Sequence, residues 1–380
     1  QGMPVTSVGS LPHTSGVTFL VRSSLNVPVT NGVVQNSFRL KRALKTLTFL
    51  SQSGARVIVA SHIGDRPTDS LLPVADHLRS TLPLVFVDDV VGQRARDALK
   101  TLRSGQILIL QNLRRDNREV ANDDSFSREL ASLADVYVND DFAASHRTHA
   151  SIVGVTQHLP SYAGIQFLEE IKGLGIARSP QSPSLAIVGG AKFGTKEPLI
   201  KKFFEQYDRV CISGALANDF FKAEGYEVGR SLTSNSVDVG DMLQNSKLLL
   251  PVDVTVDGPS GRHVCAPDEV GVADTIYDVG PKTIEMLTPL VQKARTVVWN
   301  GPLGNFEKGY SEMTERLAQL LSEAQGDSVV GGGDTIASIE KLGLNSKFEF
   351  VSTAGGAMLD YVANGTLVGI EALEKSKGIG

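Results

Sequence analysis

Short apolar, β-branched runs recur along the whole chain and alternate with stretches of helical spacing. Such runs are typical of strands that are buried on both faces, because neither face needs polar residues. We expect strands at eleven of them: 17–21, 56–60, 84–87, 107–110, 136–138, 185–188, 210–212, 248–250, 297–299, 329–330 and 348–351.

The stretches between these runs have the apolar spacing of amphipathic helices. The clearest are 40–51, 72–81, 127–134, 199–206, 281–294, 311–323 and 335–341. Alternating strands and helices predict the α/β class, with parallel sheets covered by helices on both faces. Eleven strands are more than a single sheet usually contains, so we expect two α/β domains.

The predicted boundary between these domains falls between Pro160 and Pro183. Residues 168–174 have helical character, and the residues that follow them are rich in helix breakers. A short apolar segment at 368–373 then ends the pattern and can close back on either domain.

Composition narrows the class of protein. The chain has 380 residues, of which 41% are hydrophobic and 21% charged, so it can bury substantial cores. The formal net charge of -5 and the lack of a long apolar run predict neither nucleic-acid nor membrane binding. Two cysteines, Cys211 and Cys265, cannot form a disulfide framework, which favours a reducing, cytoplasmic compartment.

Cationic side chains follow the predicted strands of the first half. In open α/β sheets the residues just beyond the carboxyl ends of strands bind ligands. A single arginine there is usually a solvated loop residue. Several recurring in an acidic protein predict a convergent site for a phosphate or carboxylate, since a guanidinium group binds oxyanions bidentately. The residues concerned are Arg22, His62, Arg66, Arg114, Arg115, His146, Arg147 and His149 at strand ends, with Arg39 at the start of the first helix.

Glycines follow the strands of the second half instead, at 189–190, 214, 301–304, 331–333 and 355–356. One such glycine is an ordinary tight turn. Five clusters predict loops whose amides approach a phosphate chain. Lys192 and Lys196 lie four residues apart at a helix start and can share one phosphate chain. Asp334 follows three glycines, where an oxygen ligand for Mg²⁺ is expected.

Several strict motifs are absent. Residues 189–197 narrowly miss the P-loop pattern, because Thr195 stands where its lysine belongs, and there is no GxGxxG fingerprint and no zinc-binding histidine pair. The residues therefore favour a two-domain phosphotransferase, with arginines holding an anion in one domain and glycines and lysines holding a nucleotide in the other. Domain closure would exclude water from the reaction.

Both halves of the chain carry distinctive short motifs. The first half carries RSSLNVP at 22–28, SHIG at 61–64, QNLR at 111–114 and VYVNDDFAASHRTHASIVG at 136–154. The second half carries GGAKFGTK at 189–196, LPVD at 250–253, DVGP at 278–281, VWNGPLGNFE at 298–307, GGGDT at 331–335 and VSTAGGA at 351–357. In sequence and in order, from about Val17 to Leu373, the chain resembles the phosphoglycerate kinase family.

The resemblance implies two Rossmann-like, doubly wound parallel-sheet domains joined by a hinge helix. Residues 1–165 would bind 3-phosphoglycerate, 166–183 would form the hinge helix and linker, 184–365 would bind the nucleotide, and 366–380 would pack back on the first domain. The implied reaction is reversible, Mg²⁺-dependent phosphoryl transfer between 1,3-bisphosphoglycerate and ADP, giving 3-phosphoglycerate and ATP. A cytoplasmic monomer is expected.

The resemblance also implies a role for individual residues. Arg39, Lys192 and Lys196 would be catalytic, and Asp334 would bind Mg²⁺. The substrate acid would be bound by Ser24, Asn26, Arg39, His62, Asp65, Arg66, Arg114 and Arg147. The nucleotide would be bound by Gly190, Lys192, Lys196, Gly214, Asn300, Pro302, Glu307, Gly332, Gly333, Asp334 and Thr335.

The sequence departs from the family's pattern at several of these positions. The family usually has aspartate at Ser24, arginine at Asp65 and glutamate at Gln111, and Arg66 follows one residue late. Ser213, Ala215 and Ala354 replace glycines and would crowd the approach to a ligand. These departures leave one alternative, a catalytically impaired relative that keeps nucleotide binding. The charge-neutralising residues are all present, which favours the active kinase.

Overall fold

The computed structural model describes residues 5–234 and 237–376. The chain divides into two compact units. Unit 1 comprises residues 1–171 and 366–380, and unit 2 comprises residues 172–365. Each unit contains its own six-stranded sheet, and all the pairings within these two sheets are parallel.

The sheet of unit 1 has the strand order β5-β6-β4-β1-β7-β8. Its strands are short and apolar, and β1 pairs with β4 on one side and β7 on the other. Their bounds are β1 Thr18–Arg22, β4 Arg56–Ala60, β5 Leu84–Phe86, β6 Ile107–Ile109, β7 Val136–Asn139 and β8 Ser161–Ala163. A two-stranded hairpin, β2 (Val29–Thr30) and β3 (Val33–Val34), follows β1.

Both faces of this sheet are buried. Alternate residues such as Phe19 and Val21 of β1 join one core cluster with the apolar sides of α1 (Phe38–Gln52) and α2 (Leu72–Leu78). Leu20, between them, is 1% exposed, so the opposite face is covered as well. The continuous apolar runs follow from this two-sided burial. The remaining helices of the first half are α3 (Gln93–Thr101) and α4 (Asp124–Ala131).

The six-stranded sheet of unit 2 has the order β11-β10-β9-β15-β16-β17. Its strands are β9 Ser184–Val188, β10 Arg209–Ile212, β11 Leu248–Leu249, β15 Thr296–Asn300, β16 Asp327–Gly331 and β17 Phe350–Val351. Its helices are α6 Phe193–Gln206, α7 Leu216–Ala223, α8 Gly240–Leu243, α9 Pro281–Lys293, α10 Glu312–Ser322, α11 Gly333–Lys341 and α12 Gly356–Asn364.

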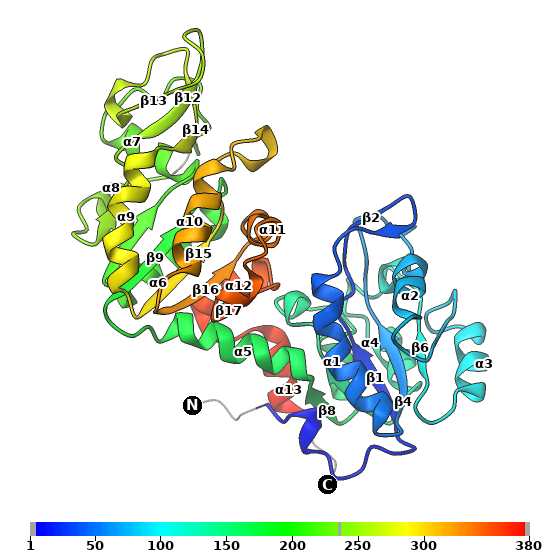
Figure 1. Ribbon diagram of the computed structural model, residues 1–380. Coiled ribbons are helices and arrows are strands. Elements are labelled where there is room, and N and C mark those ends of the chain that lie inside the picture. The colour runs from blue at the N-terminus through cyan, green and yellow to red at the C-terminus, as the bar shows by residue number, and fades with distance from the viewer. Residues whose placement is uncertain (1–4, 235–236, 377–380) are drawn as a thin grey trace. The chain divides into compact units, whose positions relative to one another are not determined.

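Unit 2 also contains a three-stranded antiparallel sheet of order β13-β12-β14. The strands are β12 Val254–Asp257, β13 His263–Cys265 and β14 Thr275–Val279. This sheet stands at one end of the unit, apart from the six-stranded sheet (Figure 1). It packs with α7 in a small core of its own that includes Ala217, Phe221, Val254 and Val256.

The division between the units falls within α5 (Ile165–Arg178). Unit 1 holds the start of this helix, where Asp140 Oδ1 accepts hydrogen bonds from the Gln166 and Phe167 amides. Gly173 and Gly175 lie inside the helix rather than ending it. In unit 2, Arg178 at its last turn donates to the Tyr361 and Val362 carbonyl oxygens.

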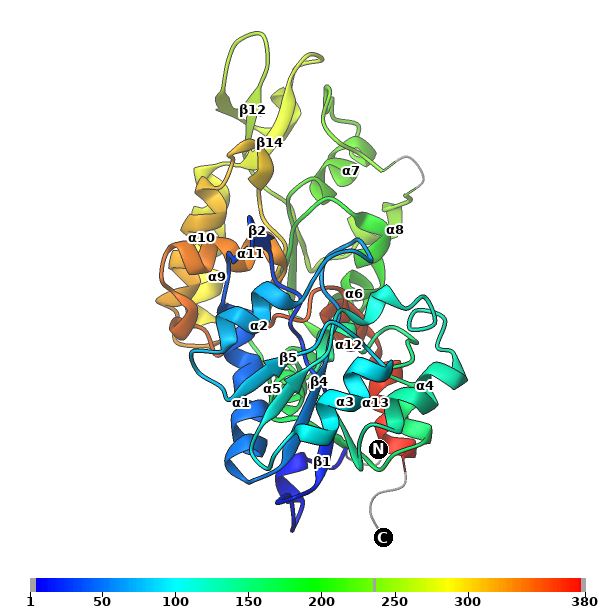
Figure 2. The ribbon, with the colours of Figure 1, turned by 90° about the vertical axis from the view of Figure 1, so that its right-hand side faces the viewer.

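The last helix, α13 (Val368–Lys375), belongs to unit 1 (red in Figure 2). The Gly369 amide donates to the Ser145 carbonyl oxygen, and Ser376 Oγ donates to the Leu159 carbonyl oxygen. The apolar segment at 368–373 is therefore a helix. Part of the expected 366–380 segment, residues 377–380, lies outside the described residues.

The α/β class with two parallel sheets is confirmed, and all eleven expected runs contain strands. All seven expected helices are present, although α4 and α6 begin earlier than expected. None of the helices in the described part of the chain combines the length and apolar character of a bilayer span.

Candidate functional site

Unit 1 has a topological switch point between β1 and β7. β4, β5 and β6 lie to one side of β1, and β7 and β8 lie to the other. Loops that leave neighbouring strands in opposite directions open a crevice at the carboxyl edge of a sheet. The residues that border this edge are 22–26 after β1 and 139–149 after β7, and both segments were expected to carry site residues.

Arg22 ends β1 and is fully buried, with 0% exposure. Its Nη1 lies 2.7 Å from Asp141 Oδ2, and its Nε donates to Ser151 Oγ over 2.8 Å. Ser151 Oγ in turn donates to the buried Glu119, over 2.6 Å to Oε2. A buried cation must be paired and hydrogen-bonded to be tolerated, and this network supplies both.

His62 accepts from this arginine, with 2.8 Å between Arg22 Nη2 and His62 Nδ1. A guanidinium group can only donate, so Nδ1 carries no proton and the ring proton sits on Nε2. Burial, and then the charges of Arg22, Arg114 and Arg39, lower the pKa of His62 to about 2. His62 is therefore a neutral hydrogen-bond donor at its Nε2.

The predicted arginines gather around this histidine. Arg39 and Arg114 both lower the pKa of His62, and Arg147 lowers the pKa of Arg114. Burial, then the neighbouring cations Arg22 and Arg147, lower the pKa of Arg114, whose Nε is buried without a hydrogen-bond partner among the described residues. Cations that repel one another in a partly dry site are well suited to an anionic ligand.

Asn26 fixes the loop beside this cluster. Its Oδ1 accepts from the Gly64 amide over 2.9 Å, and its carbonyl oxygen accepts from Arg39 Nη1 over 3.1 Å. Ser24 is 5% exposed in the same segment. Asn26 thus links the segment after β1 to both the segment after β4 and the first helix.

Asp65 stands where the family has arginine, and Arg66 follows one residue later. Both side chains are exposed. Neither is among the groups that most strongly shift the pKa of His62. The Arg66 amide donates to Asp69 Oδ2 over 2.9 Å, which holds the loop but leaves the guanidinium group to solvent. The structure therefore does not bring these two side chains into the cluster.

Gln111 has a structural explanation. Its Oε1 accepts from the Leu71 and Asn112 amides, each over 2.9 Å, and its Nε2 donates to Asp88 Oδ1 over 3.0 Å. A glutamate could not make the last contact, because an ionised carboxylate has no donor. The amide at this position is therefore matched to Asp88.

Unit 2 has its own switch point, between β9 and β15. Two glycines meet there, Gly190 after β9 with φ 95° and Gly301 after β15 with φ 94°. A Cβ on Gly301 would lie 2.4 Å from the Gly189 carbonyl oxygen, so no side chain fits. The glycines let the two loops approach each other closely, as the glycine-rich pattern predicts.

Lys196, in α6, reaches the junction of these loops. Its Nζ donates to the Gly189 carbonyl oxygen over 2.7 Å. Burial lowers the pKa of Lys196 to about 8, and the charge of Asp334 opposes this shift. Lys192, directly before the helix, is exposed. The two lysines therefore differ in setting: Lys196 is held at the strand ends, whereas Lys192 lies in solvent.

The GGGDT segment forms the start of α11. Gly332, with φ 103°, precedes the helix, and Gly333 is its first residue. Thr335 Oγ1 is buried without a hydrogen-bond partner among the described residues. Burial, then the nearby carboxylate of Glu307, raise the pKa of Asp334, so both carboxylates belong to one neighbourhood.

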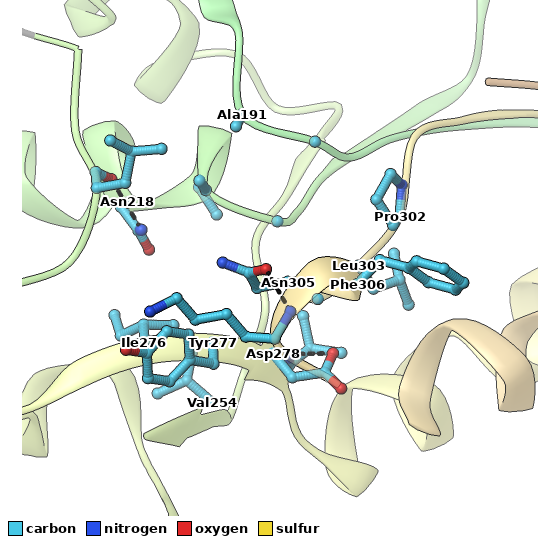
Figure 3. Close-up of a pocket in the computed structure, with 18 of the residues that line it drawn as sticks. Ala191, Asn218, Val254, Ile276, Tyr277, Asp278, Pro302, Leu303, Asn305 and Phe306 are labelled. Atoms are coloured by element: carbon cyan, nitrogen blue, oxygen red, sulfur yellow. Dashed lines mark hydrogen bonds between the residues drawn. The ribbon is translucent and has the colours of Figure 1, made fainter. Parts of the chain in front are cut away.

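A pocket of about 550 Å³ opens beside these loops, within unit 2 (Figure 3). Of the predicted nucleotide residues, Gly190, Gly214, Pro302, Glu307 and Asp334 line it. Ala215 lines it too, in place of the family's glycine. The other predicted nucleotide residues are not among those that line the pocket: Lys192, Lys196, Asn300, Gly332, Gly333 and Thr335.

The far wall of the pocket comes from the antiparallel sheet, through Val254, Ile276 and Tyr277 (Figure 3). Tyr277 stacks on Tyr310, with 4.6 Å between ring centroids. The sequence reasoning missed this wall, because β12 and β14 lack a continuous apolar run. It named Arg22 and His149 among the residues at strand ends but gave neither an individual role. A charged residue ending an apolar run was the signal for Arg22.

Comparisons with known proteins agree with these observations. The model of the family described as phosphoglycerate kinase matches residues 11–364. The curated phosphoglycerate kinase of Roseiflexus sp. (strain RS-1) is 38% identical over 382 residues, covering 94% of this chain and 96% of that protein. That of Moorella thermoacetica (strain ATCC 39073 / JCM 9320) is 40% identical, covering 93% and 95%.

Solved structures show the same likeness. The phosphoglycerate kinase of Coxiella burnetii has a TM-score of 0.83 and 34% identity, covering 97% of this chain and 98% of that one. The phosphoglycerate kinase of Pyrococcus horikoshii OT3 has a TM-score of 0.87 and 29% identity, covering 98% and 99%. With its motifs, its two parallel-sheet units and these relatives in agreement, the chain belongs to the phosphoglycerate kinase family.

Proposed function

We propose that unit 1 binds the substrate acid at its arginine cluster and that unit 2 binds the nucleotide in its pocket. The reaction is that of the family, reversible phosphoryl transfer between 1,3-bisphosphoglycerate and ADP, giving 3-phosphoglycerate and ATP. The observation that carries this division of labour is the clustering of cations in unit 1. Arg22, Arg39 and Arg114 lie close enough to His62 to lower its pKa, and Arg147 lies close enough to Arg114 to lower its pKa.

On the acid side, Arg39, Arg114 and Arg147 hold the phosphate and carboxylate of 3-phosphoglycerate. His62 donates from Nε2, because Arg22 already occupies Nδ1. Ser24 and Asn26 orient the carbon chain. Arg66 contributes to the phosphate contact by a shift of its exposed loop, and Asp65 stays in solvent. The unpartnered Arg114 Nε supports this assignment, since a buried donor without an acceptor is unfavourable.

On the nucleotide side, glycine amides and lysines hold the phosphate chain. Lys192 and Lys196 neutralise it, and the backbone of Gly190, Gly214 and 332–335 approaches it closely. The unpartnered Thr335 Oγ1 supplies a further contact. Pro302 packs against the nucleoside, Glu307 accepts from the ribose hydroxyls, and Asn300 supports the β15 end.

The donor set for Mg²⁺ is small. No cluster of three or more His, Cys, Asp or Glu side chains that could hold a metal occurs within residues 5–234 and 237–376. Mg²⁺ usually keeps several waters and takes one or two carboxylates together with substrate phosphates. Asp334, which lines the pocket together with the carboxylates Asp278 and Glu307, fits that pattern as the protein ligand. Bound with the nucleotide, Mg²⁺ would neutralise phosphate charge.

The transfer itself needs no covalent intermediate on the protein. In the ATP-consuming direction, a carboxylate oxygen of 3-phosphoglycerate forms a bond to the γ-phosphorus, and the bond from that phosphorus to the β,γ-bridging oxygen breaks. Arg39 and Lys196 neutralise the oxygens of the group in transit, and no proton transfer is required. Positioning and charge stabilisation therefore supply the catalysis.

Water must be kept from the reacting phosphate. We propose that the units close by bending at α5, which contains the division between them. We also propose that the protein is a cytoplasmic monomer. The impaired alternative rests on Ser24, Asp65 and Ala354. No observation favours it, and Ala354 is not among the residues that line the pocket of unit 2.

Separate binding measurements test the division of labour. By titration calorimetry, Arg114→Ala weakens binding of 3-phosphoglycerate at least tenfold and leaves that of ATP unchanged, since loss of a hydrogen bond to a charged group costs about 1.5–3 kcal/mol. Asp334→Ala weakens the binding of Mg²⁺-ATP and leaves that of 3-phosphoglycerate unchanged. Arg115→Ala, an exposed neighbour paired with Asp88, is the matched control for Arg114 and changes neither. Equal loss of both ligands in Arg114→Ala would refute the proposal.

A further inference from the structure

We infer that Asn218 selects the base of the nucleotide, its Oδ1 accepting a hydrogen bond from the exocyclic 6-amino group of adenine. The inference rests on the proposed function, since it takes the pocket of unit 2 as the nucleotide site. It deepens that function, because it names the residue that recognises the base. ATP is preferred over purine nucleotides that carry a carbonyl oxygen at this position.

Asn218 lies in the first turn of α7 and lines the pocket, although the residue is only 1% exposed. Its Nδ2 donates to the Leu232 carbonyl oxygen over 3.0 Å. This contact fixes which way the amide is turned, because a carbonyl oxygen can only accept. The other end of the amide, Oδ1, is therefore the group left to the pocket.

Oδ1 of Asn218 is buried and has no hydrogen-bond partner among the described residues. Such orphaned acceptors are uncommon in folded proteins and unfavourable unless a water or a ligand completes them. Figure 3 shows the Asn218 amide hanging into the pocket from the α7 side, toward Ile276 and Tyr277. A donor on a bound ligand would satisfy it.

The surroundings of Asn218 suit a flat heterocycle better than a phosphate or a sugar. Phe221, Leu232, Val254 and Ile276 line the same pocket and are all apolar. A neutral acceptor repels phosphate oxygens, whereas apolar walls with one polar group are the usual setting for an aromatic ligand. The cationic Lys196 is instead tied to the Gly189 carbonyl oxygen at the strand ends.

An acceptor at this place separates purines by their 6-substituent. Adenine carries an amino group there, which donates. Hypoxanthine and guanine carry an oxygen, which would face Oδ1 with no proton between them. A site built around a buried hydrogen bond discriminates strongly against the analogue that cannot make it, because both groups are then left unpaired.

A second amide in the pocket provides a contrast. Asn305 Oδ1 already accepts from the Lys308 amide over 3.1 Å, so its oxygen is satisfied within the protein. The dashed line in Figure 3 marks this bond. Of these two asparagines, only Asn218 thus leaves an acceptor for the base.

The test compares ATP with ITP, which differs from it at the 6-position and the adjoining N1 proton. The wild-type protein is expected to favour ATP in kcat/KM by about tenfold or more, the usual consequence of one unpaired buried group. In Asn218→Leu, of similar shape and without an acceptor, the ATP-to-ITP ratio falls to near one. A wild-type ratio near one, or an unchanged ratio in Asn218→Leu, overturns the inference.

The control is Leu232→Ala, which trims an apolar wall but keeps the carbonyl oxygen that Asn218 binds. It weakens ATP and ITP together and leaves their ratio unchanged, as any merely structural effect would. Should Asn218→Leu fail to fold, calorimetry on the wild type decides. Purine riboside triphosphate, which lacks a 6-substituent, then binds more weakly than ATP, and equal affinity overturns the inference.

These outcomes separate the inference from the proposed function. Tighter binding of ATP than of ITP without transfer to 3-phosphoglycerate would uphold the base contact and refute the function. Transfer with equal efficiency from ATP and ITP would refute the base contact and uphold the function.

Discussion

Arg22 Nη2 lies 2.8 Å from His62 Nδ1, so a buried cation holds the histidine at the centre of the arginine cluster in one tautomer. The arrangement places a neutral donor among cations, where a protonated imidazole would add repulsion. Asp141, only 2.7 Å from the same guanidinium group, keeps Arg22 itself in place. The acid-binding geometry thus depends on an ion pair beneath it.

This relationship predicts that His62 does not titrate in the physiological range. Burial and the neighbouring arginines lower its pKa to about 2, so the ring stays neutral with the proton on Nε2. Imidazole ¹⁵N spectra, assigned with His62→Gln, are expected to show this tautomer unchanged between about pH 5 and 8. Protonation of His62 near its ordinary pKa would contradict the tautomer assignment.

Lys196 is expected to be essential for turnover. Lys196→Ala removes the cation at the junction of the glycine loops, and loss of one such group from a transition state lowers kcat by about 100-fold or more. Circular dichroism should show an intact fold. Lys201→Ala is the control, because Lys201 lies on the same helix, is exposed and pairs with Glu197. Unimpaired turnover in Lys196→Ala would remove the role assigned to it.

The same lysine predicts an alkaline limb in the pH profile. Burial lowers its pKa to about 8 in the free protein, so the ammonium group is present below that pH and is lost above it. We expect kcat/KM for ATP to fall as pH rises through about 8. In Lys196→Arg the limb should disappear, since a guanidinium group stays protonated. A limb of the same midpoint in that variant would mean that another group titrates.

The displaced pair Asp65 and Arg66 offers a test of the departure from the family. Asp65→Arg puts a cation where the family has one, and we expect the KM for 3-phosphoglycerate to fall about 2–5-fold, the scale of an exposed charge interaction. Arg66→Ala should raise this KM by a similar factor. Asp65→Asn separates loss of a negative charge from gain of a positive one. An unchanged KM in all three variants would show that the loop lies away from the substrate.

The sequence predicted the two parallel sheets well, for a physical reason. Strands covered on both faces, such as β1 and β9, have no polar alternation and stand out as apolar runs. The antiparallel strands β12–β14 were missed because polar residues such as Thr255 and Asp278 interrupt their apolar runs. The hairpin of β2 and β3 could have been found from Asn31-Gly32, a pair typical of tight hairpin turns, and both residues have positive φ.

The candidate site could be predicted in its residue types but not in its contacts. A strand end indicated His62, and helix starts indicated Arg39 and Lys196. No pattern could show that Arg22 is buried beneath His62, because that depends on Asp141 and Ser151, more than a hundred residues away in the chain. Nor could it show an unpaired oxygen on Asn218, since hydrogen-bond satisfaction is a property of the folded structure.

Steady-state consumption of ATP in the presence of 3-phosphoglycerate and Mg²⁺ tests the central claim most directly. The account predicts turnover that saturates with both substrates, requires both, and falls by about 100-fold or more in Lys196→Ala. Folded protein that binds both ligands yet transfers no phosphoryl group would contradict it and restore the impaired alternative.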